Sequence, residues 1–239
     1  AEEVMPVVTR WFDDHAGDDN WYMHINFWDI HTPYRAPMEY GNKFEDDPVP
    51  PHIVDAWKRH ENKTGPHSPK DPGMYGDDKP EQWPRLPKRI DSEDNLKQYI
   101  DGYDTAIRYV DDQIKWMLDK LKAEGVYDDT VVIISADHGE NQGELGIFGE
   151  HGTADQATCN IPMIVKWPGC AGGRVDEALH YNLDWAPTMM DMLGLSKPVI
   201  WDGQSYAATL RDGEAAGRES LVISQCCHVC QRSVRFDNW

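Results

Sequence analysis

The sequence predicts an α/β fold, a three-layer α/β/α sandwich with a mostly parallel or mixed central sheet. The first observation is the apolar, β-branched run from Val131 to Ile134, which is typical of a strand buried on both faces of an α/β sheet. The second is the stretch 96–121, where apolar residues recur at spacings of three and four, as along one face of a helix. The long helix leads directly into the short strand, which is the helix-then-strand unit of a layered α/β domain.

The amino-terminal third predicts one helix, one strand and a long loop. Residues 4–12 carry apolar side chains at helical spacing, so we expect an amphipathic helix that ends near Gly17. Residues 21–31 are rich in aromatic and β-branched residues and predict a strand, which Pro33 ends. Residues 35–90 are dense in Pro, Gly, Asp and Lys, and only 53–62 has a helical pattern. This long loop is either a lid or substrate-specificity segment, or a plain surface excursion.

The remaining elements alternate in the same way. Ser92 or Asp94 can cap the long helix, and Gly125 ends it. Residues 161–167 predict a second short strand, residues 182–193 a short helix, and residues 221–224 a last strand at the start of a carboxyl-terminal region spanning 219–239. We expect residues 1–239 to form a single incomplete domain that is truncated at both ends.

Composition limits the partners. The chain carries 42 acidic and 23 basic residues, a net charge of -19, so its field repels nucleic acid and anionic membranes. An anionic small substrate therefore needs local positive charge from a metal or from basic side chains. No apolar run is long enough to span a membrane, and the amino end does not have the pattern of a signal peptide.

The five cysteines predict thiols rather than disulfides. Their number is odd, and Cys226, Cys227 and Cys230 are crowded together. With His228 this cluster can also be interpreted as a zinc site, but no second ligand pair is present, so structural or incidental thiols are favoured. The thiols and the absence of a visible signal predict a cytoplasmic protein, or a periplasmic or secreted one if a signal peptide lies upstream.

Four side chains are candidates for a site. Asp137 and His138 follow the predicted central strand, where α/β sheets bind ligands, and they offer an oxygen and a nitrogen donor that suit a divalent metal. Alternatively, Asp137 caps the following turn and His138 packs in the rim. His31 lies just before Pro33 at another strand end, and His151 lies in a glycine-punctuated loop that can fold it back over the same crevice.

Five motifs carry a resemblance to a known family. In chain order they are HTPY (31–34), ADHGE (136–140), EHGT (150–153), IPMIVKWPG (161–169) and YNLDWAPTMMDMLGL (181–195). Together they resemble the carboxyl-terminal part of the catalytic domain of the type I, formylglycine-dependent sulfatases, within the alkaline phosphatase superfamily. The likeness extends over nearly the whole chain, and it implies an alkaline phosphatase/sulfatase-like fold.

The resemblance implies a role for each candidate. Asp137 and His138 match the family's second metal pair, with Ca²⁺ expected first and Mn²⁺ or Mg²⁺ as alternatives. His31 matches the histidine of an H-x-P motif that contacts the sulfate or the leaving group. A lysine commonly stands eleven positions before the proline of the IP strand and binds a sulfate oxygen; His151 has that place relative to Pro162, so its role depends on protonation.

The family's nucleophile is a formylglycine made from Cys in C-x-P-x-R or C-x-A-x-R, and neither motif is present here. We therefore expect the nucleophile and the first metal pair upstream, and no turnover by this chain alone. The expected substrate is a small-molecule or glycan sulfate ester, favoured as a carbohydrate because Trp28, Tyr34 and Trp83 can stack on sugar rings, although core packing explains them equally well. The alternatives are a phosphodiesterase or phosphonate monoester hydrolase of the same superfamily, and a non-catalytic binding module.

Overall fold

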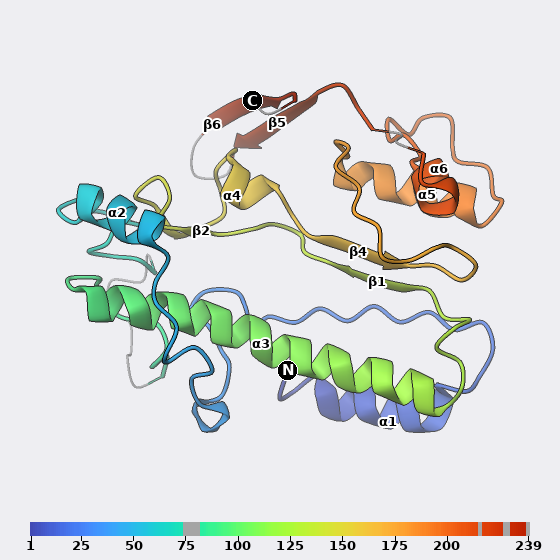
Figure 1. Ribbon diagram of the computed structural model, residues 1–239, viewed down its shortest axis with the longest axis horizontal. Coiled ribbons are helices and arrows are strands. Elements are labelled where there is room, and N and C mark those ends of the chain that lie inside the picture. Colours follow the sequence, from blue (N-terminus) through green and yellow to red (C-terminus); the bar gives the residue numbers. More distant parts are fainter. Residues whose placement is uncertain (74–81, 215–216, 227–229, 238–239) are drawn as a thin grey trace. The chain divides into compact units, whose positions relative to one another are not determined.

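A computed structural model describes residues 1–73, 82–214, 217–226 and 230–237, and these divide into two compact units (Figure 1). The first unit comprises Ala1–Asp128 and Gly139–His151, and the second comprises Asp129–His138 and Gly152–Trp239. The mixture of helices and strands confirms the α/β class.

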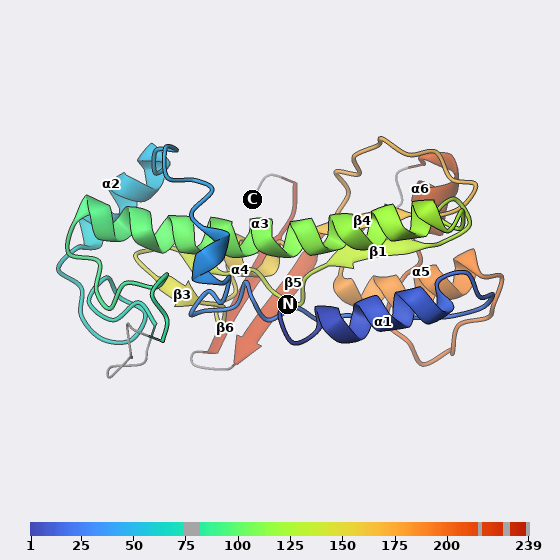
Figure 2. The ribbon, with the colours of Figure 1, turned by 90° about the horizontal axis from the view of Figure 1, so that it is seen from below.

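Two helices of the first unit lie side by side, as Figures 1 and 2 show. Helix α1 spans Met5–His15 and helix α3 spans Glu93–Ala123, both close to the predicted bounds. Val8 and Phe12 of α1 are buried together with Leu121 of α3 in one apolar cluster. The helical periodicity in the sequence therefore marked the faces that pack.

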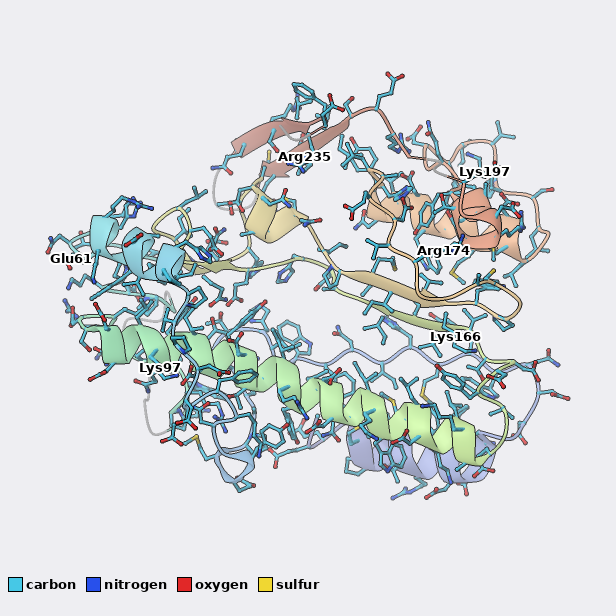
Figure 3. All side chains as sticks on the ribbon, viewed as in Figure 1. Glu61, Lys97, Lys166, Arg174, Lys197 and Arg235 are labelled. Carbon is cyan, nitrogen blue, oxygen red and sulfur yellow. The ribbon has the colours of Figure 1, made fainter. Side chains whose placement is uncertain are left out.

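The ends of α3 follow the predicted signals. Ser92 accepts a hydrogen bond from the Asn95 N–H at 3.2 Å, which satisfies one of the donors left unpaired in the first turn. Gly125 has a φ of +75°, the left-handed conformation that stops a helix. Near the amino end, Lys97 (Figure 3) donates to the carbonyl oxygens of Phe44 and Asp47 at 2.8 Å each, which fastens the long loop to α3.

The described part of the long loop 35–90 is folded into the first unit. It contains a 3₁₀ turn, η1 (Met38–Tyr40), and helix α2 (Pro51–His60), which matches the predicted helical stretch. Trp57 of α2 is buried, and its indole N–H donates to the carbonyl oxygen of Ile90 at 3.0 Å. The interpretation of this segment as a plain surface excursion is therefore wrong for these residues, since their side chains form part of the core.

The predicted strand 21–31 is wrong. Exposure alternates along residues 21–28, so the chain is extended, but it makes no strand pairing with any described residue. A strand needs a neighbouring backbone to accept its ladder of hydrogen bonds. Met23 and Ile25 instead pack against the apolar cluster of α1 and α3. A short hairpin that the sequence did not predict, β2 (Asn141–Gln142) and β3 (Phe148–Glu150), completes this unit.

The second unit contains the predicted central strand. Strand β1 spans Val132–Ser135 and pairs with β4 (Met163–Lys166). This pairing is antiparallel, as are the other pairings among the described residues, and Ile133 is 37% exposed. The sheet was expected to be mostly parallel or mixed and β1 to be buried on both faces. Neither parallel pairs nor two-sided burial of β1 is present among the described residues, because β1 has only one strand beside it there.

Short helices and a hairpin make up the rest of the second unit. The helices are α4 (Gln156–Cys159), η2 (Asn182–Asp184), α5 (Trp185–Met192) and α6 (Ala207–Asp212), and the hairpin pairs β5 (Leu221–Cys226) with β6 (Cys230–Arg235). Asp184 at the η2–α5 junction is 1% exposed and accepts two hydrogen bonds from Arg218. This bidentate pair ties the short helices to the segment that precedes β5.

Candidate functional site

His31 lies at the end of the extended segment in the first unit. Its Nδ1 is 2.8 Å from the carbonyl oxygen of Thr32, an acceptor, so Nδ1 carries a hydrogen. The imidazole is also close to the Trp28 ring, at 4.8 Å between centroids. The Thr32 carbonyl oxygen therefore fixes the tautomer of this histidine, and Trp28 lies beside its ring.

His151, at the end of the same unit, lies beside His31. The two rings are 5.2 Å apart between centroids and meet edge to face at 67°. The His151 backbone N–H donates to Glu150 Oε1 at 2.9 Å, while Glu150 Oε2 lies 3.0 Å from His67 Nε2. The His67 Nδ1 in turn contacts the Phe148 carbonyl oxygen at 3.0 Å. A residue of the long loop thus buttresses the backbone that presents His151.

A buried carboxylate, Glu140, joins the H-T-P-Y loop to the segment that follows His138. Glu140 Oε1 accepts hydrogen bonds from Tyr34 Oη at 2.7 Å, Thr32 Oγ1 at 3.0 Å and Gln142 Nε2 at 3.1 Å. Burial raises the pKa of Glu140, and hydrogen bonds from Tyr34 and Thr32 oppose the rise only in part. Sequence reasoning missed this residue, although it is the last letter of ADHGE.

Asp137 and His138 lie in the second unit, directly after β1. Asp137 Oδ1 accepts a hydrogen bond from the His138 N–H at 3.1 Å, so the turn-capping contact of the alternative interpretation is present. Its side chain is nevertheless 86% exposed, whereas His138 is mostly covered. A carboxylate oxygen and an imidazole nitrogen on adjacent residues fit a divalent cation as donors, but two donors do not complete a shell.

The four predicted residues are thus divided between the units. His31 and His151 are brought together in the first unit, and Asp137 and His138 are neighbours in the second.

The aromatic residues predicted to stack on a sugar differ in exposure. Tyr34 is 1% exposed and its hydroxyl is used by Glu140, so its proposed stacking role is wrong. Trp28 is 58% exposed, and Trp83 is half-buried. Only the two tryptophans remain available to a ligand.

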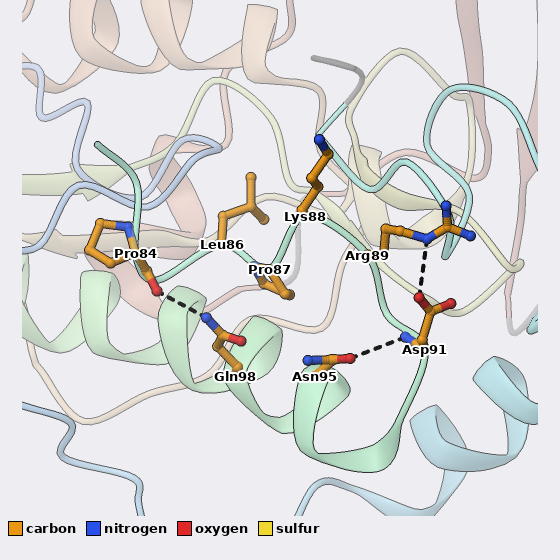
Figure 4. A pocket seen from close by; sticks show the side chains of 8 residues that line it. All are labelled: Pro84, Leu86, Pro87, Lys88, Arg89, Asp91, Asn95 and Gln98. Atoms are coloured by element: carbon orange, nitrogen blue, oxygen red, sulfur yellow. Dashed lines mark hydrogen bonds and ion pairs between the residues drawn. The ribbon is translucent and has the colours of Figure 1, made fainter. Parts of the chain in front are cut away.

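A cavity of about 400 Å³ lies elsewhere in the first unit (Figure 4). It is lined by residues of the loop 84–91 and by Asn95 and Gln98 of α3. Its wall is held by hydrogen bonds from Gln98 to the Pro84 carbonyl oxygen at 3.0 Å and from the Asp91 N–H to Asn95 at 3.3 Å. None of the four predicted residues lines this cavity.

The cysteine cluster is described only in part. Cys226 and Cys230 are exposed free thiols that face each other in the β5–β6 register. Cys227 and His228 lie outside the described residues. Among the residues that are described, the candidate zinc site has no further ligand from this cluster.

Comparisons with known proteins agree with the motifs. The family model described as Sulfatase matches residues 1–195. Choline-sulfatase of Rhizobium meliloti is 27% identical over 201 residues, which cover 82% of this chain and 36% of the relative. Endo-4-O-sulfatase of Bacteroides thetaiotaomicron is 25% identical over 224 residues, covering 85% of this chain and 42% of the relative.

A solved structure shows the same fold. The phosphonate monoester hydrolase SpPMH from Silicibacter pomeroyi superposes with a TM-score of 0.67 and 26% identity, over 94% of this chain and 43% of that protein. This likeness identifies the α/β fold as alkaline phosphatase/sulfatase-like. The chain spans less than half of the length of these relatives. Among the helices that the structure describes, none combines the length and hydropathy that crossing a membrane requires.

Proposed function

Since this chain belongs to the sulfatase family, we propose that it supplies part of the active site of a hydrolase that cleaves a sulfate ester, with a carbohydrate as the alcohol. The observation that carries the proposal is the edge-to-face pair of His31 and His151, which come from the two motifs that resemble the family's sulfate-contacting positions. Two adjacent imidazoles offer the positive charge that a sulfate needs in a chain whose net charge is -19.

The chemistry of the reaction suits these residues. Negative charge lies on the sulfate oxygens and builds on the leaving alcohol, so cationic donors stabilise the first and a positioned acid protonates the second. His31 carries its fixed hydrogen on Nδ1, which makes Nε2 the nitrogen that contacts the sulfate or gives a proton to the leaving oxygen. His151, in its protonated form, binds a sulfate oxygen.

Asp137 and His138 would hold a divalent cation, with Ca²⁺ expected before Mn²⁺ or Mg²⁺. Bound there, such an ion supplies positive charge to the sulfate oxygens and to the attacking group. Asp137 fits this role because Oδ1 serves the turn while the carboxylate stays exposed. The remaining ligands and the formylglycine nucleophile are expected upstream, so we propose that residues 1–239 alone do not turn over.

The test uses 4-nitrophenyl sulfate with the full-length protein and with the 239-residue chain. We expect metal-dependent hydrolysis by the full-length protein and none by the 239-residue chain. Changing Asp137 to Asn should abolish the activity of the full-length protein. The matched control is Asp191→Asn, which removes an exposed carboxylate in the same unit. Hydrolysis by the isolated chain, or full activity of the Asp137→Asn enzyme, would contradict the assignment.

A phosphonate monoester or phosphodiester hydrolase is the second candidate. The likeness to the Silicibacter pomeroyi enzyme favours it, because it extends over almost the whole chain. The ratio of kcat/KM for 4-nitrophenyl sulfate to that for 4-nitrophenyl phenylphosphonate decides between the two: a ratio above one supports the sulfatase, and a ratio well below one supports the alternative. A non-catalytic module hydrolyses neither ester and holds no metal at Asp137.

A further inference from the structure

Arg35 lies between two tryptophans at the turn that also presents His31. Its guanidinium carbon is over the Trp28 ring at 5.9 Å from the centroid and over the Trp83 ring at 5.3 Å. Guanidinium groups in this position are attracted to the negative face of the indole. The two rings therefore hold the cation, whose N–H groups all lie in the guanidinium plane and remain able to donate hydrogen bonds.

The backbone places Arg35 firmly. The Arg35 N–H donates to the Asp29 carbonyl oxygen at 2.8 Å, which closes the turn on itself. One edge of the guanidinium is used as well, since Nη1 donates to the carbonyl oxygens of Trp28 at 3.0 Å and of His31 at 3.2 Å. The cation is thus set in position before any ligand arrives, and such preorganisation lowers the cost of binding.

The other edge of Arg35 has no protein partner among the described residues. Nε and Nη2 make no hydrogen bond there, and no described carboxylate forms an ion pair with this arginine. An Arg edge with two parallel N–H groups matches the two oxygens of a carboxylate. In a chain with a net charge of -19, this unpaired edge supplies local positive charge to which an anion can bind.

Trp28 connects this cation to the candidate catalytic histidine. It is 58% exposed, and its ring contacts both Arg35 and His31, the latter at 4.8 Å between centroids. An exposed indole is a surface on which a sugar ring can stack. A sugar ring that stacks on Trp28 would therefore lie close to both His31 and Arg35.

We propose that Trp28, Arg35 and Trp83 form a subsite for the alcohol part of the substrate, and that this part is a sugar ring that bears a carboxylate. The proposal rests on the proposed function only for its link to His31, because the subsite itself is a binding site. Arg35 binds the carboxylate through Nε and Nη2, and Trp28 carries the ring. No bond is made or broken at this subsite.

Binding is tested first, because it does not depend on turnover. The indole N–H signals of Trp28 and Trp83 in the full-length protein are followed by NMR during titration with glucuronate and with its methyl ester. We expect glucuronate to bind at least about 10-fold more tightly than the ester, and Arg35→Gln to abolish this preference. Arg10→Gln, which removes an exposed arginine of α1, should leave it unchanged.

Turnover is tested with 4-carboxyphenyl sulfate and its methyl ester. For the carboxylate, Arg35→Gln should lower kcat/KM by about 10- to 100-fold, mainly through KM, and for the ester by less than about 3-fold. Arg35→Lys keeps a positive charge near the two indole rings but loses the pair of parallel N–H donors. It should therefore lose most of the preference for the carboxylate over the methyl ester, while the thermal midpoint stays near that of the wild type.

The outcomes separate the two proposals. Equal binding of glucuronate and its ester, or an equal loss of kcat/KM on both sulfates in Arg35→Gln, overturns the subsite and shows that Arg35 only braces the His31 turn. Arg35-dependent binding of glucuronate without hydrolysis of either sulfate keeps the subsite and overturns the sulfatase proposal.

Discussion

The hydroxyl of Tyr34 donates a hydrogen bond to Glu140 at 2.7 Å, which joins the H-T-P-Y loop to the D-H-G-E motif across 106 positions of sequence. Both side chains are buried, and Thr32 donates to the same carboxylate oxygen. Glu140 therefore fixes the loop that carries His31 by binding Thr32 and Tyr34, in addition to the hydrogen bond that the His31 ring itself makes. The first prediction follows from this carboxylate.

Glu140→Ala should lower the free energy of unfolding by about 2–4 kcal/mol, because the hydroxyls of Tyr34 and Thr32 lose a charged acceptor in a buried place. Urea unfolding followed by tryptophan fluorescence measures the loss. Glu61→Ala is the control, since this exposed residue (Figure 3) should change stability by no more than about 0.5 kcal/mol. A similar small change for both variants would contradict the role of Glu140.

The Asp184–Arg218 pair should make the second unit sensitive to acid. Burial alone raises the pKa of Asp184, but hydrogen bonds from Arg218 and from the Gln204 and Tyr181 N–H groups lower it below its ordinary value. A lowered pKa in the folded state stabilises the fold above the ordinary carboxyl pKa, near 3.9, and this stabilisation is lost as the pH falls through the folded value. Thermal midpoints recorded between pH 7 and pH 2 should therefore fall steeply at the acid end.

Asp184→Asn removes the charged partner of a bidentate arginine and should lower the free energy of unfolding by about 3 kcal/mol at neutral pH. Its thermal midpoint should also fall less steeply as the pH is lowered. Asp191→Asn breaks the exposed pair with Arg211 and should cost less than about 1 kcal/mol. If the thermal midpoint of Asp184→Asn fell at acid pH as steeply as that of the wild type, the Asp184 carboxylate would be excluded as the source of the acid sensitivity.

Gly102→Ala should destabilise the first unit although alanine favours helices. A Cβ at position 102 of α3 would lie 2.7 Å from the Arg85 carbonyl oxygen and 3.2 Å from Cδ2 of Tyr34. The gain in helix propensity, about 1 kcal/mol, is smaller than the cost of this overlap, so a net loss of about 1–2 kcal/mol is expected. Gly17→Ala meets open space and is the control. A stabilised Gly102→Ala protein would show that the Arg85 backbone moves aside.

His151→Lys should change the pH profile of sulfate hydrolysis by the full-length enzyme. If a protonated His151 binds the sulfate, activity falls as the pH rises and the imidazole loses its proton. A lysine at this place stays charged to about pH 10, so the fall should disappear. Initial rates between pH 5 and pH 9 measure both profiles. A flat wild-type profile, or the same fall in His151→Lys, would count against a cationic role for His151.

Elements that depend on local sequence were predicted well. The periodic apolar residues of α1 and α3, the cap at Ser92 and the stop at Gly125 are set by neighbours within a few positions, and all four are confirmed. The strand at residues 21–31 was wrong because its existence depends on a partner strand that the sequence does not specify.

The buried polar contacts were not predictable. The sequence does not distinguish Glu140 from the many exposed acidic residues. For Tyr34 it is equally consistent with stacking on a sugar and with core packing, and the fold buries this residue. The contact of Arg35 with Trp83 joins residues 48 positions apart, which the sequence does not indicate. The candidate histidines were found because strand ends and glycine-rich loops mark ligand sites, yet their meeting in one unit required the fold.

A double-mutant cycle on His31 and His151 tests the central claim most directly. In the full-length protein, kcat/KM for 4-nitrophenyl sulfate is measured for His31→Ala, His151→Ala, the double variant and the exposed control His52→Ala. Each single change should cost about 100-fold or more, the double change should cost clearly less than the product of the two, and His52→Ala should cost nothing. Wild-type rates in either single variant, or losses that simply multiply, would contradict a joint role of the two rings on one sulfate.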